Sequence, residues 1–237
     1  MKKISNKIFR ILHKNHEIEV IVKKNKLSRN YKLTFDKKTL SGLVSIPNYI
    51  SYKDAFIFAQ ENSKWLFDQF NEISPLIIIN HEAIISFEGK NKKIIFISGS
   101  PSEVKLENNS IIVISNRNSH NKILYKWIKN RILENTKKSV SLFSKTLNVK
   151  IRKIRLSNSF SYWGSCNSNN EISINWRLIF SPPDVLDYII AHEMSHIIEF
   201  NHGKNFWDIV DKLIPNKKGQ QYWLKRNGNY LYRIRFN

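Results

Sequence analysis

Residues 192–196 read His-Glu-Met-Ser-His and lie in an apolar segment with the spacing of a helix. Two histidines at positions i and i+4 project from one face of a helix, so both imidazoles can reach a single Zn²⁺ at about 2.0–2.1 Å. Glu193 lies about 100° further round the helix, where it can take a proton from a zinc-bound water and pass it to a leaving amine. The pattern therefore predicts a zinc-dependent peptide hydrolase, with His192 and His196 as ligands and Glu193 as the catalytic carboxylate.

The residues before this motif have the features of a helix start. Pro183 can occupy the first turn without losing a needed N–H, and the carboxylates of Asp184 and Asp187 suit the positive end of a helix. Isoleucines surround the motif, namely Ile189, Ile190, Ile197 and Ile198. The helix is therefore expected to begin near Pro183 and to be buried in a core.

A catalytic zinc usually has three protein ligands and one open position for water. His202 becomes the third ligand if the chain turns back near Asn201, and Asn201 and Gly203 are both types that tolerate the left-handed conformation that ends helices. Glu199 is the alternative, but a carboxylate so close to the motif would need the helix to distort. The histidine spacing matches that of metzincins, yet the turning glycine of metzincins is Glu199 here, and no methionine follows residue 194 to form their Met-turn.

Three longer blocks of sequence contain or precede the motif. They are Tyr162–Cys166, Ile172–Pro183, and Asp187–His196 continuing to Asn201–Trp207. Together they resemble the YgjP-like metallopeptidases, which are related to the SprT-like zinc proteases; the resemblance is strong over residues 150–230 and looser before them. It implies zinc on His192, His196 and His202, with Glu193 as the catalytic carboxylate. Tyr162 departs from the family, which more often has arginine there, but this leaves the zinc ligands intact.

Hydrophobic periodicity predicts an α+β protein with a β-rich amino-terminal region over residues 1–120. The zinc motif and the family resemblance imply a zincin-like catalytic region over residues 121–237. In the first region, strands are expected at 18–22, 31–35 and 43–46 and again within 82–115, with a helix at 52–72. In the second region, helices are expected at 121–147, 204–214 and 218–227, and strands at 150–156 and 171–174.

In zincins, a strand beside the metal helix holds an extended substrate by backbone pairing. The segment Trp163–Cys166, with the strand that follows, is the candidate for this wall. Trp163 is expected either at the wall or in the core, and Trp176 in the core. An additional donor to the developing oxyanion is usual, and Tyr188, Tyr222 and Arg177 are equally open candidates.

Cys166 is the single cysteine of the chain, so an internal disulfide is excluded. Its expected role is a small, half-buried thiol beside the cleft. A structural zinc site is normally closed by a fourth protein ligand, often cysteine. A non-catalytic binding module, with a structural zinc closed by Cys166, is therefore an alternative function from a different class.

The chain of 237 residues carries 39 basic and 19 acidic side chains, a net charge of +20. Such a charge favours anionic partners, so weak nucleic-acid binding is expected beside a peptide or protein substrate, and a nucleic-acid-associated protease is a second alternative. Lys7 and Arg10 interrupt the apolar stretch that a secretory signal would need, and no run approaches the ~20 apolar residues of a membrane span. A cytoplasmic protein is expected, and the oligomeric state is not indicated.

Overall fold

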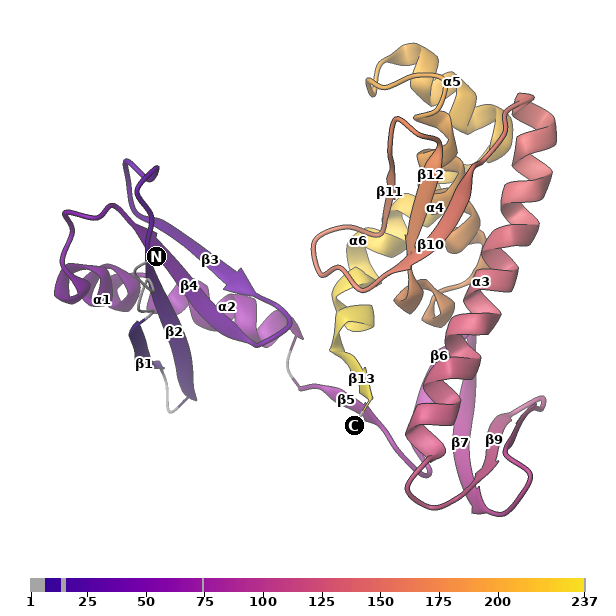
Figure 1. Ribbon diagram of the computed structural model, residues 1–237, viewed down its shortest axis with the longest axis horizontal. Coiled ribbons are helices and arrows are strands. Elements are labelled where there is room, and N and C mark those ends of the chain that lie inside the picture. The colour runs from indigo at the N-terminus through magenta and orange to yellow at the C-terminus, as the bar shows by residue number, and fades with distance from the viewer. Residues whose placement is uncertain (1–6, 14–15, 74, 237) are drawn as a thin grey trace. The chain divides into compact units, whose positions relative to one another are not determined.

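The computed structural model describes residues 7–13, 16–73 and 75–236, and its chain divides into two compact units, Met1–Leu76 and Ile77–Asn237 (Figure 1). We refer to them as the N-terminal and C-terminal units. Residues 1–6, part of the basic segment on which the absence of a secretory signal was argued, lie outside the described residues. Among the residues that are described, no helix has the length and apolar character needed to cross a membrane.

The N-terminal unit is a four-stranded sheet with two helices. Its strands are β1 (Lys7–His13), β2 (His16–Lys24), β3 (Lys32–Asp36) and β4 (Ser41–Ile46), in the order β1-β2-β4-β3. Its helices are α1 (Tyr52–Glu61) and α2 (Ser63–Ile73). The three predicted strands are confirmed, and β1 was not predicted. The single helix expected at 52–72 is in fact two, because the chain leaves helical geometry at Asn62, whose side-chain amide donates to the Phe58 carbonyl at 2.8 Å.

The first part of the C-terminal unit is a second four-stranded sheet with the order β6-β7-β9-β8. Its strands are β6 (Ile84–Phe87), β7 (Lys90–Ser98), β8 (Glu103–Leu106) and β9 (Ser110–Ser115). Glu88 and Gly89 join β6 to β7 with φ angles of 49° and 77°, the positive values that a tight two-residue hairpin needs. The Glu88 carboxylate accepts two hydrogen bonds from Arg131 at 2.7 and 3.1 Å, so this turn is held against the long helix that follows.

The predicted boundary near residue 120 differs from the division between Leu76 and Ile77. The sheet β6–β9 shares one core with the long helix α3 (His120–Leu147). Near the start of the unit, β5 (Ile77–Ile79) pairs in parallel with β13 (Ile234–Phe236) at its end. Strand periodicity shows that a segment is a strand, but not which core the strand joins, so it did not assign these strands to the core of α3.

The rest of the C-terminal unit carries the motif helix. A three-stranded sheet has the order β10-β12-β11, with β10 (Lys153–Ser157) parallel and β11 (Gly164–Cys166) antiparallel to β12 (Glu171–Asn175). The short helix η1 (Trp176–Phe180) leads into α4 (Pro183–Ser195), followed by α5 (Lys204–Leu213) and α6 (Lys217–Arg233). The helices and strands predicted for this region are confirmed, and the whole fold is α+β as expected.

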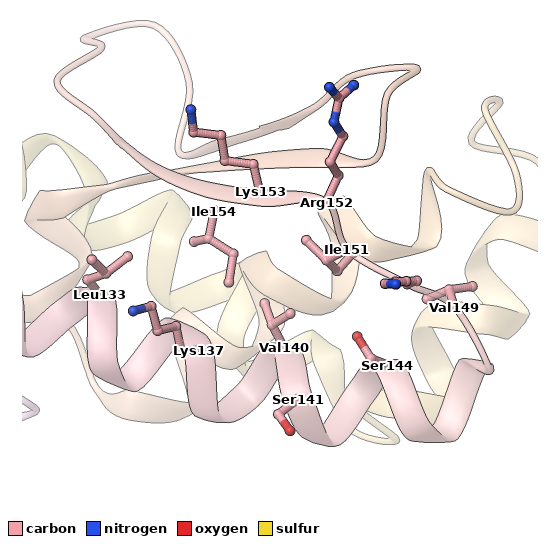
Figure 2. Close-up of a pocket in the computed structure, with 11 residues that line it drawn as sticks. Leu133, Lys137, Val140, Ser141, Ser144, Val149, Ile151, Arg152, Lys153 and Ile154 are labelled. Carbon is pink, nitrogen blue, oxygen red and sulfur yellow. The ribbon is translucent and has the colours of Figure 1, made fainter.

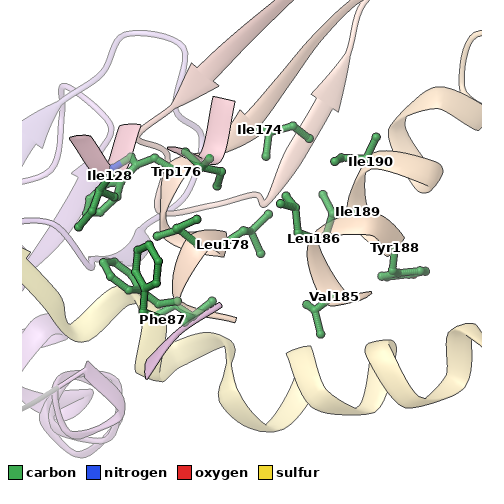
Figure 3. Packing of buried hydrophobic residues seen from close by; sticks show 14 of the residues in the cluster. Phe87, Ile128, Ile174, Trp176, Leu178, Val185, Leu186, Tyr188, Ile189 and Ile190 are labelled. Carbon is green, nitrogen blue, oxygen red and sulfur yellow. The ribbon is translucent and has the colours of Figure 1, made fainter. Parts of the chain in front are cut away.

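The helix α4 is buried, as its isoleucines predicted. Ile190, Ala191 and Met194 are fully buried, and Figure 3 shows Ile190 and Leu186 near Ile174 of β12 in the shared core. Pro183 is the first residue of α4, as expected. In its second turn, Asp187 accepts a hydrogen bond from Ser139 of α3 at 2.5 Å. Core packing on several sides therefore sets the position of the motif.

Candidate active site

Three histidine side chains converge at the end of α4. His192 lies in the last turn of the helix, His196 is the residue that caps its end, and His202 comes from the loop after it; one ring nitrogen of each lies within 4.8 Å of the others. The Nε2 atoms of His192 and His202 are 3.1 Å apart. Two nitrogens bound tetrahedrally to one metal at about 2.0–2.1 Å would be separated by roughly 3.4 Å. The spacing of the three imidazoles is therefore compatible with one Zn²⁺-sized ion.

The chain reaches His202 by a shorter route than the sequence suggested. The helix α4 ends at Ser195, and the peptide N–H groups of Ile198 and Glu199 both donate to the Ser195 carbonyl, at 3.1 and 2.9 Å. Neither Asn201 nor Gly203 has a positive φ. The expected left-handed turn at Asn201 is therefore wrong, because the helix ends early enough for an ordinary turn to bring His202 back.

The three rings have neighbours that hold them in place. The Nδ1 atom of His196 lies 3.3 Å from the Glu199 carbonyl, and a hydrogen bond there leaves Nε2 free for a metal. Phe206 of α5 is fully buried, and its ring centroid lies 4.5–4.9 Å from those of all three histidines. Burial lowers the pKa of His192 to about 4, helped by the other two histidines, so its ring is in the neutral form that binds metals.

Glu199, the alternative ligand, does not join the cluster among the described residues. Its carboxylate accepts a backbone hydrogen bond from Asn201 at 3.4 Å, and its carbonyl faces His196. Glu199 therefore supports the loop and the His196 ring rather than the metal position.

Glu193 is buried beside the histidine cluster, with 7% of its surface exposed. Burial raises the pKa of its carboxyl to about 7. The strand β11 passes so close that a Cβ atom on Gly164 would lie 2.6 Å from Cγ and from Oε1 of Glu193. Only glycine leaves room at this point, which explains why Gly164 follows Trp163 at the start of β11.

A cleft of about 400 Å³ opens beside His192 and Glu193 and extends along the preceding turn of α4. Besides these two residues it is lined by Tyr162, Trp163, Gly164, Tyr188, Ile189, Gln221 and Leu224. Glu193 is the only acidic side chain among the lining residues, and neither lysine nor arginine is present. The cleft therefore suits an uncharged side chain next to the groups that could carry the chemistry.

The three open candidates for an oxyanion donor are in different surroundings. Tyr188 lines the cleft, and its hydroxyl accepts a hydrogen bond from Gln221 at 3.1 Å. Tyr222 is 60% exposed and its hydroxyl accepts from Arg226. Arg177 is buried over the Phe160 ring, outside the residues that line the cleft. Of the three, only Tyr188 lines the cleft beside His192 and Glu193.

Trp163 lines the cleft and also stacks on Tyr232 of α6, with ring centroids 4.4 Å apart. Both expectations for Trp163 therefore hold in part. Trp176 is 3% exposed and belongs to the core, as predicted. Gly228 lets α6 approach, since a Cβ atom there would lie 3.3 Å from the Trp163 ring.

Cys166, at the end of β11, is half-buried, as expected. Burial raises the pKa of its thiol, and the nearby Glu193 carboxylate raises it further. Its sulfur does not join the histidine cluster among the described residues. A protonated thiol outside the cluster fits neither a nucleophile nor a fourth ligand.

Three residues that contribute to the candidate site were not identified from the sequence. Phe206 was expected only as an inward side chain of a terminal helix, although it belongs to the third block of the family resemblance. Gln221 and Leu224 line the cleft from α6, and no sequence pattern indicated that they would do so. They are about 30 residues from the motif, and nothing local to them indicates what they face.

Comparison with known proteins gives one family match. A family model described as YgjP-like, metallopeptidase domain matches residues 29–227. Among solved structures, the metallopeptidase zymogen of Pyrococcus abyssi abylysin is similar, with a TM-score of 0.35 and 14% identity over 39% of this chain and 92% of that chain. The metallopeptidase zymogen of Methanocaldococcus jannaschii jannalysin has a TM-score of 0.33 and 22% identity over 38% and 86%, respectively. The curated proteins give no match.

Proposed function

We propose that this chain, which belongs to the YgjP-like metallopeptidase family, is a zinc-dependent enzyme that hydrolyses peptide bonds. The family match confirms the resemblance stated from the sequence and agrees with a zincin-like catalytic region. The observation that carries the proposal is the convergence of His192, His196 and His202 with the buried carboxylate of Glu193 beside them. Three imidazoles with no fourth protein ligand among the described residues are typical of a catalytic zinc site.

When bound, zinc would lower the pKa of a coordinated water and polarise the carbonyl of the scissile bond. Glu193 would move the proton: one carboxylate oxygen accepts it from the attacking water and then donates it to the nitrogen of the leaving amine. The tight packing of Gly164 against this side chain supports the role, because it limits the positions that the carboxylate can adopt.

We assign the additional oxyanion donor to Tyr188. Its hydroxyl already accepts a hydrogen bond from Gln221, so its own hydrogen is available to the substrate. Donation to the carbonyl oxygen as negative charge develops is the usual role of such a group.

The strand β11 is the proposed wall for the substrate backbone. It is an edge strand that pairs only with β12 among the described residues, so its outer edge can pair with an extended peptide. The cleft between β11, α4 and α6 would then receive an uncharged side chain of that peptide.

The two alternatives have less support. A structural zinc would need a closing ligand, and Cys166 is outside the histidine cluster. A nucleic-acid-associated protease would keep the same chemistry and add a basic docking surface. The net charge of +20 favours it, but this charge is spread over the chain.

The central test is metal analysis of protein purified without added metal. We expect one zinc per chain, with zinc affinity strongly reduced in His202→Ala and unchanged in Glu199→Ala. Stoichiometric zinc in a His192→Ala, His196→Ala double variant would contradict the ligand assignment. A proteome-wide comparison of cleavage products between the wild type and Glu193→Gln would then identify the substrates. Identical cleavage products for both proteins would refute the proposed peptidase activity.

A further inference from the structure

A groove of about 450 Å³ lies between α3 and β10, at the edge of the sheet opposite β11. Its floor is apolar and is formed by Leu133 and Val140 of α3 and by Ile151 and Ile154 of the strand segment. Figure 2 shows Ile151, Ile154 and Val140 pointing into the space between the strand and the helix. None of the residues that line this groove also lines the cleft beside His192.

The backbone along one side of the groove is an open strand edge. Among the described residues, β10 pairs only with β12. The Asn175 N–H donates to the Trp163 carbonyl, so the odd-numbered residues of β12 direct their backbone groups toward β11 and its even-numbered residues bond to β10. Because Lys153 lies opposite Glu171 in this parallel pair, Lys153 and Arg155 bond to β12, and the N–H and C=O of Ile154 and Leu156 face outward. These groups are available to an added strand.

The charged side chains that line the groove are all positive. Lys137, Lys150, Arg152 and Lys153 are among its lining residues, and no acidic side chain is. Figure 2 shows Arg152 and Lys153 on the side of the strand that faces away from α3, whereas Ile151 and Ile154 are on the side that faces it. A strand laid along β10 would therefore meet apolar atoms on one face and positive charge on the other.

We propose that this groove binds an extended segment of a partner protein, with alternating apolar and acidic residues, by strand addition to β10. The apolar side chains of the partner pack against Leu133 and Ile154, which are both partly exposed, and its carboxylates lie beside Arg152 and Lys153. Successive side chains of a strand point to opposite faces, which is the alternation that the two sides of the groove select. Main-chain hydrogen bonds to β10 give affinity, and the alternation gives specificity.

A protein fits this groove better than a nucleic acid does. A strand edge presents peptide donors and acceptors at the spacing of another peptide strand. A single nucleic-acid strand would instead use stacking on aromatic side chains and a run of phosphate contacts. The lining of the groove contains no aromatic residue.

The test uses the full chain carrying Glu193→Gln, so that bound peptides are not cleaved and the result does not depend on catalysis. A fluorescein-labelled peptide of eight residues, alternating valine with glutamate, is titrated by anisotropy. Matched probes are the same peptide with lysine for glutamate, a version with its glutamates grouped at one end, and an oligothymidine. We expect the alternating acidic peptide to bind at least about tenfold more tightly than each of the others.

Two further peptides, N-methylated on alternate residues, separate strand addition from charge attraction. Methylation of the edge that pairs with β10 should weaken binding about tenfold or more, whereas methylation of the opposite edge should be tolerated. Equal loss with both methylation patterns, or tighter binding of the oligothymidine, would overturn the proposal.

A variant pair tests the use of the strand edge on the side of the protein. Ile154→Pro removes an outward N–H at an edge strand, where proline is tolerated, and Ile154→Ala removes the same side chain but keeps the N–H. With matched melting temperatures for the two variants, a larger loss of binding for Ile154→Pro is expected. Equal losses for the two variants would mean that the strand edge is not used.

Discussion

The sheet β10-β12-β11 has two edges, and their surroundings differ in charge and in space. At the β11 edge, Gly164 lies directly against the buried Glu193, and the adjoining cleft contains neither lysine nor arginine. At the β10 edge, a groove separates the strand from α3 and basic side chains surround it. We propose that both edges pair with an extended chain, and the difference in their neighbouring elements is why we assign hydrolysis to the β11 edge and binding alone to the β10 edge.

Removing the base at the β11 edge should have the largest effect. Glu193→Gln keeps the shape of the side chain against Gly164 but cannot accept the proton, so peptide hydrolysis should fall on the order of 10⁴-fold. Zinc content and melting temperature should stay as in the wild type. A variant that kept a tenth of the activity would show that proton transfer occurs elsewhere.

The proposed oxyanion donor should have the next largest effect. Tyr188→Phe removes one hydroxyl from the cleft and should lower kcat by about 10²–10³-fold with little change in KM. Tyr222→Phe is the matched control, because the Tyr222 hydroxyl accepts a hydrogen bond from Arg226 outside the cleft. The kcat of this variant should be unchanged. Equal kcat values for the two variants would remove Tyr188 from the mechanism.

A methyl group on β11 tests the close contact at that edge. Gly164→Ala would place Cβ 2.6 Å from Glu193, which should cost about 1–3 kcal/mol of unfolding free energy and lower kcat about 10²-fold by displacing the carboxylate. Gly219→Ala meets nothing within 4 Å and is the control. Thermal melts and hydrolysis rates measure both, and wild-type activity in Gly164→Ala would show that the position of Glu193 tolerates the shift.

The smallest effect concerns charge at the β10 edge. Weak DNA binding that comes from the overall charge of +20 should fade by about 150 mM salt, because released counterions drive it. Lys153→Gln and Lys64→Gln, exposed lysines of different units, should weaken it by the same small factor. A salt titration with labelled DNA measures this. Binding that stays sub-micromolar at physiological salt, with a selective loss in Lys153→Gln, would make the β10 edge a nucleic-acid site.

The sequence by itself determined the local elements and where the candidate site residues lie along them. The histidine spacing in α4 follows from the helical repeat, which relates residues only one turn apart. The isoleucines around the motif predicted that the helix would be buried, and the need for a third ligand directed attention to His202. All of these depend on neighbours within about ten residues, which is why the pattern was sufficient.

Tertiary structure decided which distant elements meet. The α6 wall of the cleft, with Gln221 and Leu224, comes from a helix whose own pattern gives no sign of what it faces. The requirement for glycine at position 164 arises only because β11 crosses the Glu193 side chain. The strands of β6–β9 join the core of α3 rather than that of the N-terminal unit. Hydrophobic periodicity specifies which face of an element is buried, but packing between distant elements selects the partner that buries it.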